Sequence, residues 1–125
     1  MDFSNKRIVV VGGSSGIGRE IVERLHEAGA ELWVWARREM SDLEGLGIHV
    51  SAVDVTRDIG GQSPELPEEV DGLVYAPGSI ELAPFRQLSP EKMAVEYDLN
   101  VIGAVRVIQY ALKALTGGGG GSVVF

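Results

Sequence analysis

Short apolar runs alternate along the chain with longer segments in which apolar residues recur at helical spacing. Five runs predict strands over Arg7–Val11, Glu31–Ala36, His49–Val53, Gly72–Tyr75 and Ser122–Phe125. Helical patterns lie at about Ser15–Ala28 and Pro90–Leu115. The unbroken run Ile8–Val11 is typical of a parallel strand that is covered on both faces. The alternation predicts an α/β fold with a doubly wound parallel sheet, in one domain over residues 1–125.

The two predicted helices differ in how much apolar surface they carry. The first has one stripe, formed by Ile17, Ile21, Leu25 and Ala28. The second has two stripes: Met93, Tyr97, Val101, Ala104, Ile108, Ala111 and Leu115 on one side, and Val95, Leu99, Ile102 and Val105 on another. Such a helix is either well covered within its own domain or also packs against a second subunit. The crossover Thr56–Val70 contains Gly60-Gly61, Pro64 and Pro67, so it is predicted to be mostly loop with at most one turn of helix.

A glycine turn joins the first strand to the first helix. Its glycines are Gly12, Gly16 and Gly18, and Ser14 and Ser15 add hydroxyl donors. Glycine allows a tight turn and a close approach of the backbone to a pyrophosphate, and the free N–H groups of the helix favour an anion there. The strand–turn–helix context favours a dinucleotide site over a tight turn without a ligand. A P-loop is disfavoured because no Lys-Ser/Thr pair follows the last glycine.

Composition narrows the class of protein further. The 125 residues carry a net charge of −7, which argues against nucleic acid and anionic membranes as partners. There is no cysteine, no apolar run long enough to span a membrane and no signal-peptide pattern, so we expect a soluble cytoplasmic protein. His26 and His49 are far apart in sequence and no metal-ligand spacing occurs, so no metal is predicted. The run Gly117–Gly121 fits either a natural turn or an engineered linker.

Taken together, these motifs resemble the short-chain dehydrogenase/reductase family. The resemblance is carried by the Gly12–Gly18 turn, by Asp54-Val55 after the third strand, by Asn100 in the long helix and by Ser122–Phe125. It implies a Rossmann-like sheet with strand order 3-2-1-4-5, and hydride transfer between NAD or NADP and an alcohol or carbonyl. It also places Asp54 and Val55 at the adenine and Asn100 in the family's proton relay, although Asp54 could equally cap the turn that follows it.

The chain also departs from the family pattern. Val11 stands where a threonine is common, and Tyr75-Ala76-Pro77-Gly78 stands where the family carries Asn-Asn-Ala-Gly. The family's catalytic serine and its Tyr-x-x-x-Lys pair lie beyond its fifth strand. We therefore expect a truncated, cofactor-binding part of such an enzyme that is inactive alone. The alternative is a non-catalytic minimal or engineered nucleotide-binding module, and a flavodoxin-like protein is a weaker third reading.

The residues that follow the second strand favour NADP over NAD. Ala36 falls near the position of the acidic residue that binds the ribose in NAD-preferring proteins, and Arg37 and Arg38 follow it. Arginine suits a 2′-phosphate, although both residues could be ordinary surface charges. The full predicted cofactor set is Gly12, Ser14, Ser15, Gly16, Ile17, Gly18, Arg37, Arg38, Asp54, Val55, Ala76, Pro77 and Gly78.

A homodimer is expected from two apolar surfaces. Strand 122–125 would form an unprotected sheet edge, because the family's next neighbouring strand is not among these residues. The second stripe of helix 90–115 would also need a cover. The net charge of −7 opposes close approach of two copies.

Overall fold

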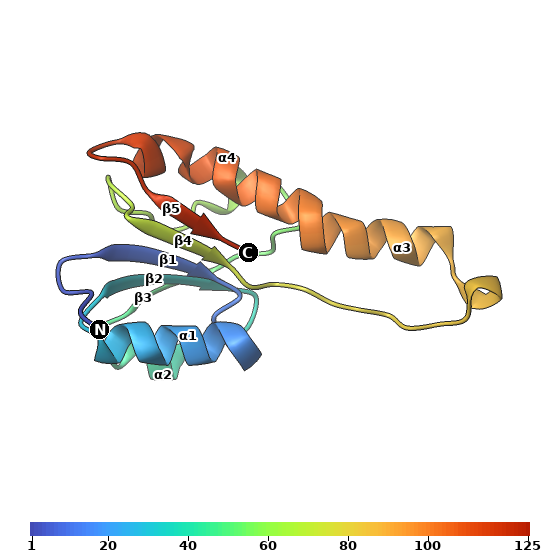
Figure 1. Ribbon diagram of the computed structural model, residues 1–125, viewed down its shortest axis with the longest axis horizontal. Helices are drawn as coiled ribbons and strands as arrows, with labels where there is room; N and C mark the ends of the chain where they lie inside the picture. Colours follow the sequence, from blue (N-terminus) through green and yellow to red (C-terminus); the bar gives the residue numbers. More distant parts are fainter.

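The computed structural model describes residues 1–125 and contains one sheet of five parallel strands (Figure 1). The strands are β1 (Arg7–Val11), β2 (Glu31–Ala36), β3 (His49–Ala52), β4 (Gly72–Tyr75) and β5 (Ser122–Val124). Their order is β3-β2-β1-β4-β5, which confirms the predicted Rossmann-like sheet. The third and fifth strands each end one residue earlier than predicted.

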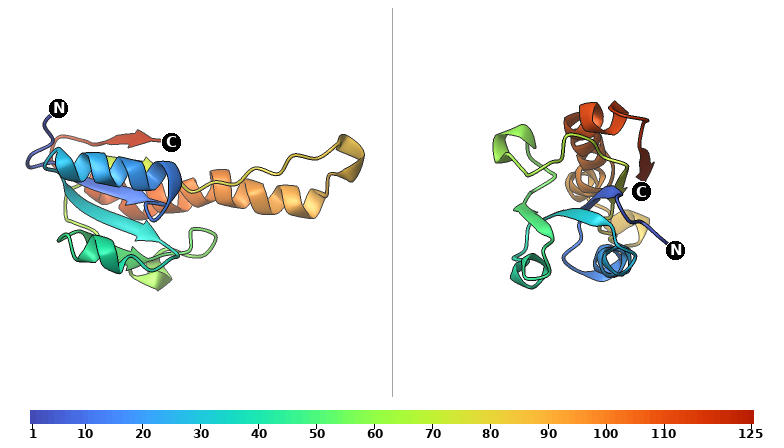
Figure 2. Two further views of the ribbon diagram at one scale, coloured as in Figure 1. Left: turned by 90° about the horizontal axis from the view of Figure 1, so that it is seen from below. Right: turned by 90° about the vertical axis from the view of Figure 1, so that its left-hand side faces the viewer.

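The chain also forms four α-helices: α1 (Gly16–Glu27), α2 (Ser41–Glu44), α3 (Pro90–Tyr97) and α4 (Gly103–Thr116). The single turn α2 was not predicted. Helices α1 and α2 cover one face of the sheet and α4 covers the other (Figures 1 and 2). None of the helices is both long enough and apolar enough to cross a lipid bilayer.

The alternation of side chains along β1 divides the core into two layers. Val9 and Val11 pack in the larger layer with Trp35 and the α4 residues Val107 and Ala111. Ile8 and Val10 point to the opposite face and pack in a second layer with Val22 of α1 and Leu43 of α2. Because both faces are covered, the central strands β1, β2 and β4 are apolar almost throughout, as the sequence pattern indicates.

The first helix corrects one detail of the predicted stripe. Val22 is fully buried, and Ile21 and Leu25 pack at the edge of the smaller core layer. Ile17, however, is 80% exposed and does not belong to the core. It lies in the first turn of α1, which begins beyond the carboxyl end of the sheet, so no strand lies beneath this side chain.

The predicted long helix is divided by a π-helical turn over Asp98–Ile102. Here the Tyr75 hydroxyl donates a hydrogen bond to the Leu99 carbonyl at 2.5 Å. Gly103 leaves room for this side chain, because a Cβ at that position would lie 2.5 Å from the Tyr75 hydroxyl oxygen. Burial raises the pKa of Tyr75 to about 12.

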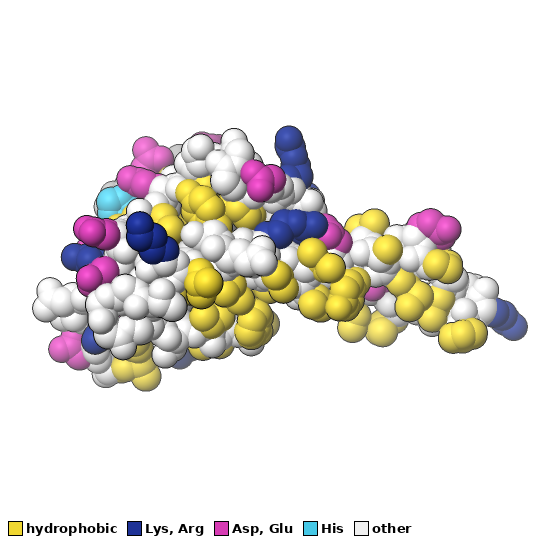
Figure 3. Space-filling view, turned by 90° about the horizontal axis from the view of Figure 1, so that it is seen from above, with side chains coloured by type: hydrophobic (Ala, Val, Ile, Leu, Met, Phe, Trp, Pro, Cys, Tyr) yellow, Lys and Arg dark blue, Asp and Glu magenta, His cyan; other side chains and the backbone are white.

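The π turn changes which helical residues reach the core. Ala104, Ala111 and Leu115 of the predicted stripe are buried, and so are Val107 and Ala114. Met93, Tyr97 and Val101 of the same stripe are exposed, which corrects the prediction for the first half of the helix. The segment 79–97, named the arm below, extends beyond the end of the sheet (Figures 1 and 2). Apolar side chains gather along the arm and the start of α4 in Figure 3, where the exposed ones are Ile80, Leu82, Phe85, Met93, Val95, Tyr97, Val101, Ile102 and Val105.

The crossover from β3 to β4 is mostly loop, as predicted, with one 3-10 turn over Gly60–Gln62. It is nevertheless tied to the core. The Trp35 indole N–H donates to the Glu65 carbonyl at 3.0 Å, and the Val70 N–H donates to the Ala114 carbonyl at 3.0 Å. Buried Ile59 and Val70 then fill the space beside α4.

Candidate functional site

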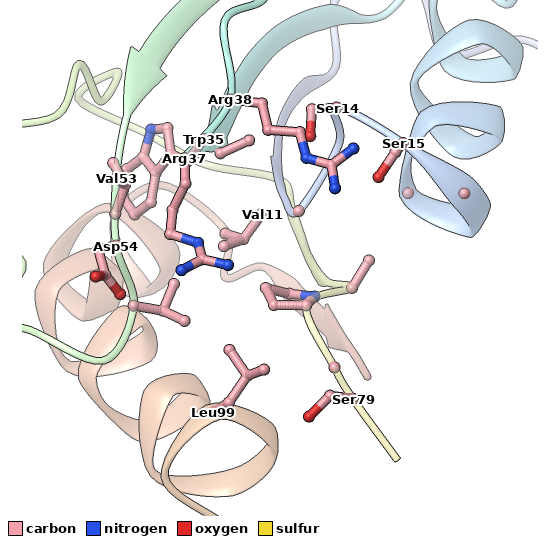
Figure 4. A pocket seen from close by; sticks show the side chains of 18 of the residues that line it. Val11, Ser14, Ser15, Trp35, Arg37, Arg38, Val53, Asp54, Ser79 and Leu99 are labelled. Carbon is pink, nitrogen blue, oxygen red and sulfur yellow. The ribbon is translucent and has the colours of Figure 1, made fainter. Parts of the chain in front are cut away.

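An open cavity of about 740 Å³ lies at the carboxyl ends of the parallel strands (Figure 4). Four segments line it, each of which follows a strand: the turn after β1, Arg37 and Arg38 after β2, Val53–Thr56 after β3, and Ala76–Ser79 after β4. Side chains of α3 and the π turn close the remaining wall. The crevice outside the carboxyl ends of the strands is the usual ligand site of open α/β sheets.

The three glycines of the turn after β1 serve different purposes. Gly12 has a φ of +81°, and a Cβ there would lie 2.7 Å from the backbone nitrogen of Pro77. A Cβ on Gly18 would lie 2.1 Å from the Gly12 carbonyl oxygen, so this position lets the helix sit against the turn. Gly16 has a φ of +59° but no atom within 4 Å of its Cβ position. Only Gly16 therefore leaves open space on the cavity side.

The first turn of α1 presents polar backbone to the same space. Ser15 is the N-cap residue, and its side chain does not bond to the N–H groups of the helix. No acidic side chain lies in the first turn. These N–H groups and the positive end of the helix dipole are thus available to an anion.

Two cations stand in the cavity of this acidic protein. Arg37 and Arg38 line it, and Asp54 is the single acidic side chain among the lining residues. Neither guanidinium forms an ion pair or hydrogen bond within the chain, whereas Arg19, Arg24 and Arg106 are all paired. In Figure 4 the Arg38 guanidinium points toward Ser14, and that of Arg37 points toward the side of Asp54 and Leu99.

Asp54 caps the turn that follows it, as one of the two predicted roles for this residue requires, but it uses only one carboxylate oxygen to do so. Its Oδ1 accepts from the Thr56 hydroxyl at 2.6 Å and from the Thr56 N–H at 3.0 Å. These hydrogen bonds hold the pKa of Asp54 below its ordinary value, and Arg37 adds to the effect. Asp54 Oδ2 and the N–H of Val55 have no hydrogen-bond partner within the chain. Two neighbouring residues of the cavity lining therefore retain one free acceptor and one free donor.

Asn100 is not one of the lining residues and acts on the cavity wall instead. Its Oδ1 accepts from the Ser79 N–H at 3.0 Å, and its Nδ2 donates to the Ser79 carbonyl at 2.8 Å. A Cβ on Gly78 would lie 2.9 Å from Asn100 Oδ1, so glycine allows the close approach. The side chain thus fixes the segment Gly78–Ser79 against the π turn.

The cavity brings together all thirteen residues of the predicted cofactor set, from four separate segments. Their contact with a cofactor stays a prediction. The residues that the prediction missed are Val11, Trp35, Ala36, Val53, Thr56, Ser79, Val95 and Leu99. Most of these directly flank predicted ones, so extending each motif by one residue would have found them. Val95 gave no such signal, because the arm's position relative to the sheet is a tertiary property.

No group of three or more histidine, cysteine, aspartate or glutamate side chains in the structure could hold a metal ion. His49 instead stacks on Trp33, with ring centroids 4.6 Å apart, and lies 3.6 Å from Glu31 and 3.5 Å from Glu65.

Comparison with known proteins gives a consistent match. The family model described as short chain dehydrogenase matches residues 6–125. L-xylulose reductase of Bos taurus is 30% identical over 98% of this chain and 52% of its own length. Carbonyl reductase (NADPH) 2 of Sus scrofa is 31% identical over 92% of the chain and 49% of its own length. The chain therefore spans about half the length of the curated relatives it matches.

Solved structures show the same likeness in three dimensions. A short-chain type dehydrogenase/reductase from Mycobacterium ulcerans superposes with a TM-score of 0.81 at 27% identity, over 98% of this chain and 51% of that one. A short chain dehydrogenase from Salmonella enterica serovar Typhi superposes with a TM-score of 0.85 at 21% identity, over 98% and 58%. The second likeness concerns the fold alone.

Proposed function

This chain belongs to the short-chain dehydrogenase family, and on that premise we propose that it is the NADP-binding portion of an oxidoreductase. When bound, the nicotinamide ring would supply hydride transfer to or from an alcohol or carbonyl compound. The residues of this chain would bind and orient the dinucleotide. The name of the porcine relative, carbonyl reductase (NADPH) 2, agrees with both parts of the proposal.

The observation that carries the proposal is a cavity lined both by Gly16, which has open space at its Cβ position, and by two arginines without ion-pair partners. The N–H groups at the start of α1 would hold the pyrophosphate, and Gly16 lets the backbone approach it. Arg38, which points toward Ser14, would bind the 2′-phosphate with its planar fork of donors. No carboxylate stands at the end of β2, where the last residue is Ala36.

The free donor and acceptor at Asp54 and Val55 match the edge of adenine. Adenine offers the N6 amino group as a donor and N1 as an acceptor. Asp54 Oδ2 can accept from the first and the Val55 N–H can donate to the second. The depressed pKa keeps the Asp54 carboxylate ionised, and therefore a pure acceptor, at neutral pH.

Asn100 and the segment Ala76–Ser79 would form the far wall, toward the nicotinamide. Asn100 would act by holding Gly78 and Ser79 in place, because both polar atoms of its amide are already used by the Ser79 backbone. We assign it a positioning role in this chain. A part in a proton relay would also require the Tyr-x-x-x-Lys pair, which does not occur among these 125 residues.

Calorimetric titration with NADPH and NADH tests the proposal. We expect NADPH to bind more tightly, and Arg38→Ala to weaken NADPH by about 10- to 150-fold while sparing NADH. Arg37→Ala should weaken NADPH less, because its guanidinium points toward Asp54. Arg86→Ala, which removes a cation from the arm outside the cavity, is the control. Equal or tighter binding of NADH would overturn the assignment of NADP.

The alternative is a nucleotide-binding module without catalysis. It is favoured by Tyr75-Ala76-Pro77, which stands in place of the family's polar residues after β4. Both functions predict no hydride transfer by these 125 residues alone, so an assay over a panel of carbonyl compounds tests this shared expectation, and turnover would contradict both. NADPH binding without turnover by these 125 residues is the expected result.

We also propose that two copies of the chain associate, either through the edge strand β5 or through the exposed apolar face of helix 90–115. Val124 and Phe125 are exposed at the edge, and Val101, Val105 and Leu112 are exposed at helical spacing on the helix. A cytoplasmic location likewise stays a prediction from composition.

A further inference from the structure

A side chain outside the cavity holds residues that face into it. Gln62 lies in the 3-10 turn of the crossover and is not among the lining residues. Its Oε1 accepts from the Asp54 N–H at 2.7 Å. Its Nε2 donates to the Asp54 carbonyl at 2.9 Å and to the Asp58 carbonyl at 2.9 Å. One side-chain amide thus pairs with both polar backbone groups of Asp54, as a neighbouring strand would.

Asp54 lacks a strand neighbour at this point. β3 is an edge strand of the sheet, and its pairing with β2 ends at Ala36 and Ala52. The Val53 N–H still reaches the Ala36 carbonyl at 3.0 Å, but no strand lies on the outer side of Asp54. The side-chain amide of Gln62 takes that place, and its hydrogen bonds hold the backbone of Asp54 in order beyond the end of the strand.

The pairing with Gln62 also sets the direction of the next N–H. The carbonyl of Asp54 and the N–H of Val55 belong to one planar trans peptide unit, in which they point in opposite directions. Because the carbonyl is bound to Gln62, the Val55 N–H points away from Gln62. Arg106 fixes the other side of Val55, since its Nη1 donates to the Val55 carbonyl at 3.0 Å.

We propose that Gln62 is a positioning residue of the adenine subsite, which fixes the Asp54–Val55 backbone so that its free donor and acceptor meet the edge of adenine. This inference rests on the dinucleotide binding proposed above. Gln62 itself would not touch the cofactor. Its contribution would be to order the turn before the ligand arrives, which lowers the conformational cost of binding.

A base with the reversed edge provides the test. Hypoxanthine carries a carbonyl at C6 and a proton on N1, so it mismatches both the Asp54 carboxylate and the Val55 N–H. We would measure the affinities of NADPH and of reduced nicotinamide hypoxanthine dinucleotide phosphate by calorimetry. The proteins are the wild type, Gln62→Met, which keeps the side-chain length without hydrogen bonds, and Gln109→Met as the control on an exposed, unbonded glutamine of α4.

We expect the wild type and Gln109→Met to prefer the adenine dinucleotide by about tenfold or more, since two hydrogen bonds are matched. Gln62→Met should lower this preference to about threefold or less, mainly by weakening NADPH. A merely structural role would weaken both dinucleotides equally and leave the preference intact, and that result would overturn the inference.

The failures of the two proposals are distinguishable. A wild type that binds neither dinucleotide removes the proposed function and this inference with it. A wild type that prefers adenine, together with an unchanged preference in Gln62→Met, refutes the role of Gln62 alone. If thermal unfolding shows that Gln62→Met does not fold, Gln62→Glu replaces it, because it keeps the acceptor for the Asp54 N–H and loses the donors. The same loss of preference is expected, and an unchanged preference counts against the inference equally.

Discussion

At the scale of single residues, Gly16 and Gly47 form a matched pair. Both have positive φ, +59° and +79°, and neither has an atom within 4 Å of its Cβ position. Only Gly16 lines the cavity. We expect Gly16→Val and Gly47→Val each to lower the free energy of unfolding by about 1–2 kcal/mol, because a branched residue is strained in the left-handed region. NADPH affinity should be lost in Gly16→Val alone.

Urea unfolding and calorimetry on both variants give the two measurements. An unchanged NADPH affinity in Gly16→Val would place the dinucleotide elsewhere. A similar loss in Gly47→Val would mean that strain, rather than a blocked approach of the pyrophosphate, causes the effect.

Tyr75 makes stability depend on alkaline pH. Its folded-state pKa is about 12, whereas an unperturbed tyrosine titrates near pH 10. The neutral form is thus favoured by the folded state, so its contribution is fully present below about pH 10 and is lost as the pH rises toward 12. The shift of roughly two pKa units corresponds to a loss of about 2 kcal/mol over that range.

Tyr75→Phe removes this dependence together with the hydrogen bond to the Leu99 carbonyl. We expect a free energy of unfolding lower by about 1–2 kcal/mol at pH 8 and a smaller further loss between about pH 10 and 12 than in the wild type. Urea unfolding across this range measures both, with Tyr97→Phe as the control on an exposed tyrosine. Parallel pH profiles for wild type and Tyr75→Phe would contradict the assignment.

At the scale of elements, Arg106 joins α4 to both the π turn and the end of β3. It reaches Asp98 at 2.7 Å and the Val55 carbonyl at 3.0 Å, with both charged side chains about one-third exposed. The pair Arg24 and Glu20 on α1 also joins an arginine to a carboxylate, but it lies within one helix and fully at the surface. Double-mutant cycles with Arg106→Met/Asp98→Asn and Arg24→Met/Glu20→Gln compare them.

We expect a coupling free energy of about 1 kcal/mol for the first pair and no measurable coupling for the second, because solvent screens the exposed pair. Arg106→Met should cost more in total than the coupling alone, since the Val55 carbonyl also loses its donor. Equal couplings in the two cycles would show that Arg106 does not organise the junction.

The same elements show what sequence reasoning can reach. Strand positions and the glycine turn followed from local pattern, because a buried parallel strand must be apolar on both faces and a turn against backbone must lack a Cβ. The break at Asp98–Ile102 could not be predicted from local pattern, because the Leu99 carbonyl within it meets the hydroxyl of Tyr75, which is more than twenty residues away. Ile17 was misassigned for a similar reason: its periodicity fits the stripe, but the sheet has ended where it lies. The role of Gln62 was equally invisible, since nothing in a loop sequence shows which backbone its amide will meet.

At the scale of the whole molecule, the exposed apolar surface predicts self-association. Light scattering across a concentration series should show a dimer that is favoured by added salt, because screening reduces the repulsion between two chains of net charge −7. Val105→Glu should abolish the dimer if the helix forms the interface, and Val124→Lys should abolish it if the edge of β5 does.

The two variants test different surfaces, so one of them should remain dimeric. A monomer at every concentration in the wild type would contradict the proposal. Protection of the β5 amides from hydrogen exchange in such a monomer would mean that the chain itself shields this edge.

The π turn has a consequence for the direction of the arm. Each residue of a helix accounts for about 100° of rotation around its axis, so the wider turn at Asp98–Ile102 offsets the faces of α3 and α4 by roughly that angle. Deleting one residue there would let a regular helix form without a break. It would also swing Asn100 away from Ser79 and carry the apolar side chains of the arm around to another side. The number of residues between the Leu99 carbonyl, which Tyr75 contacts, and the buried face of α4 thus determines which way the apolar side chains of the arm face.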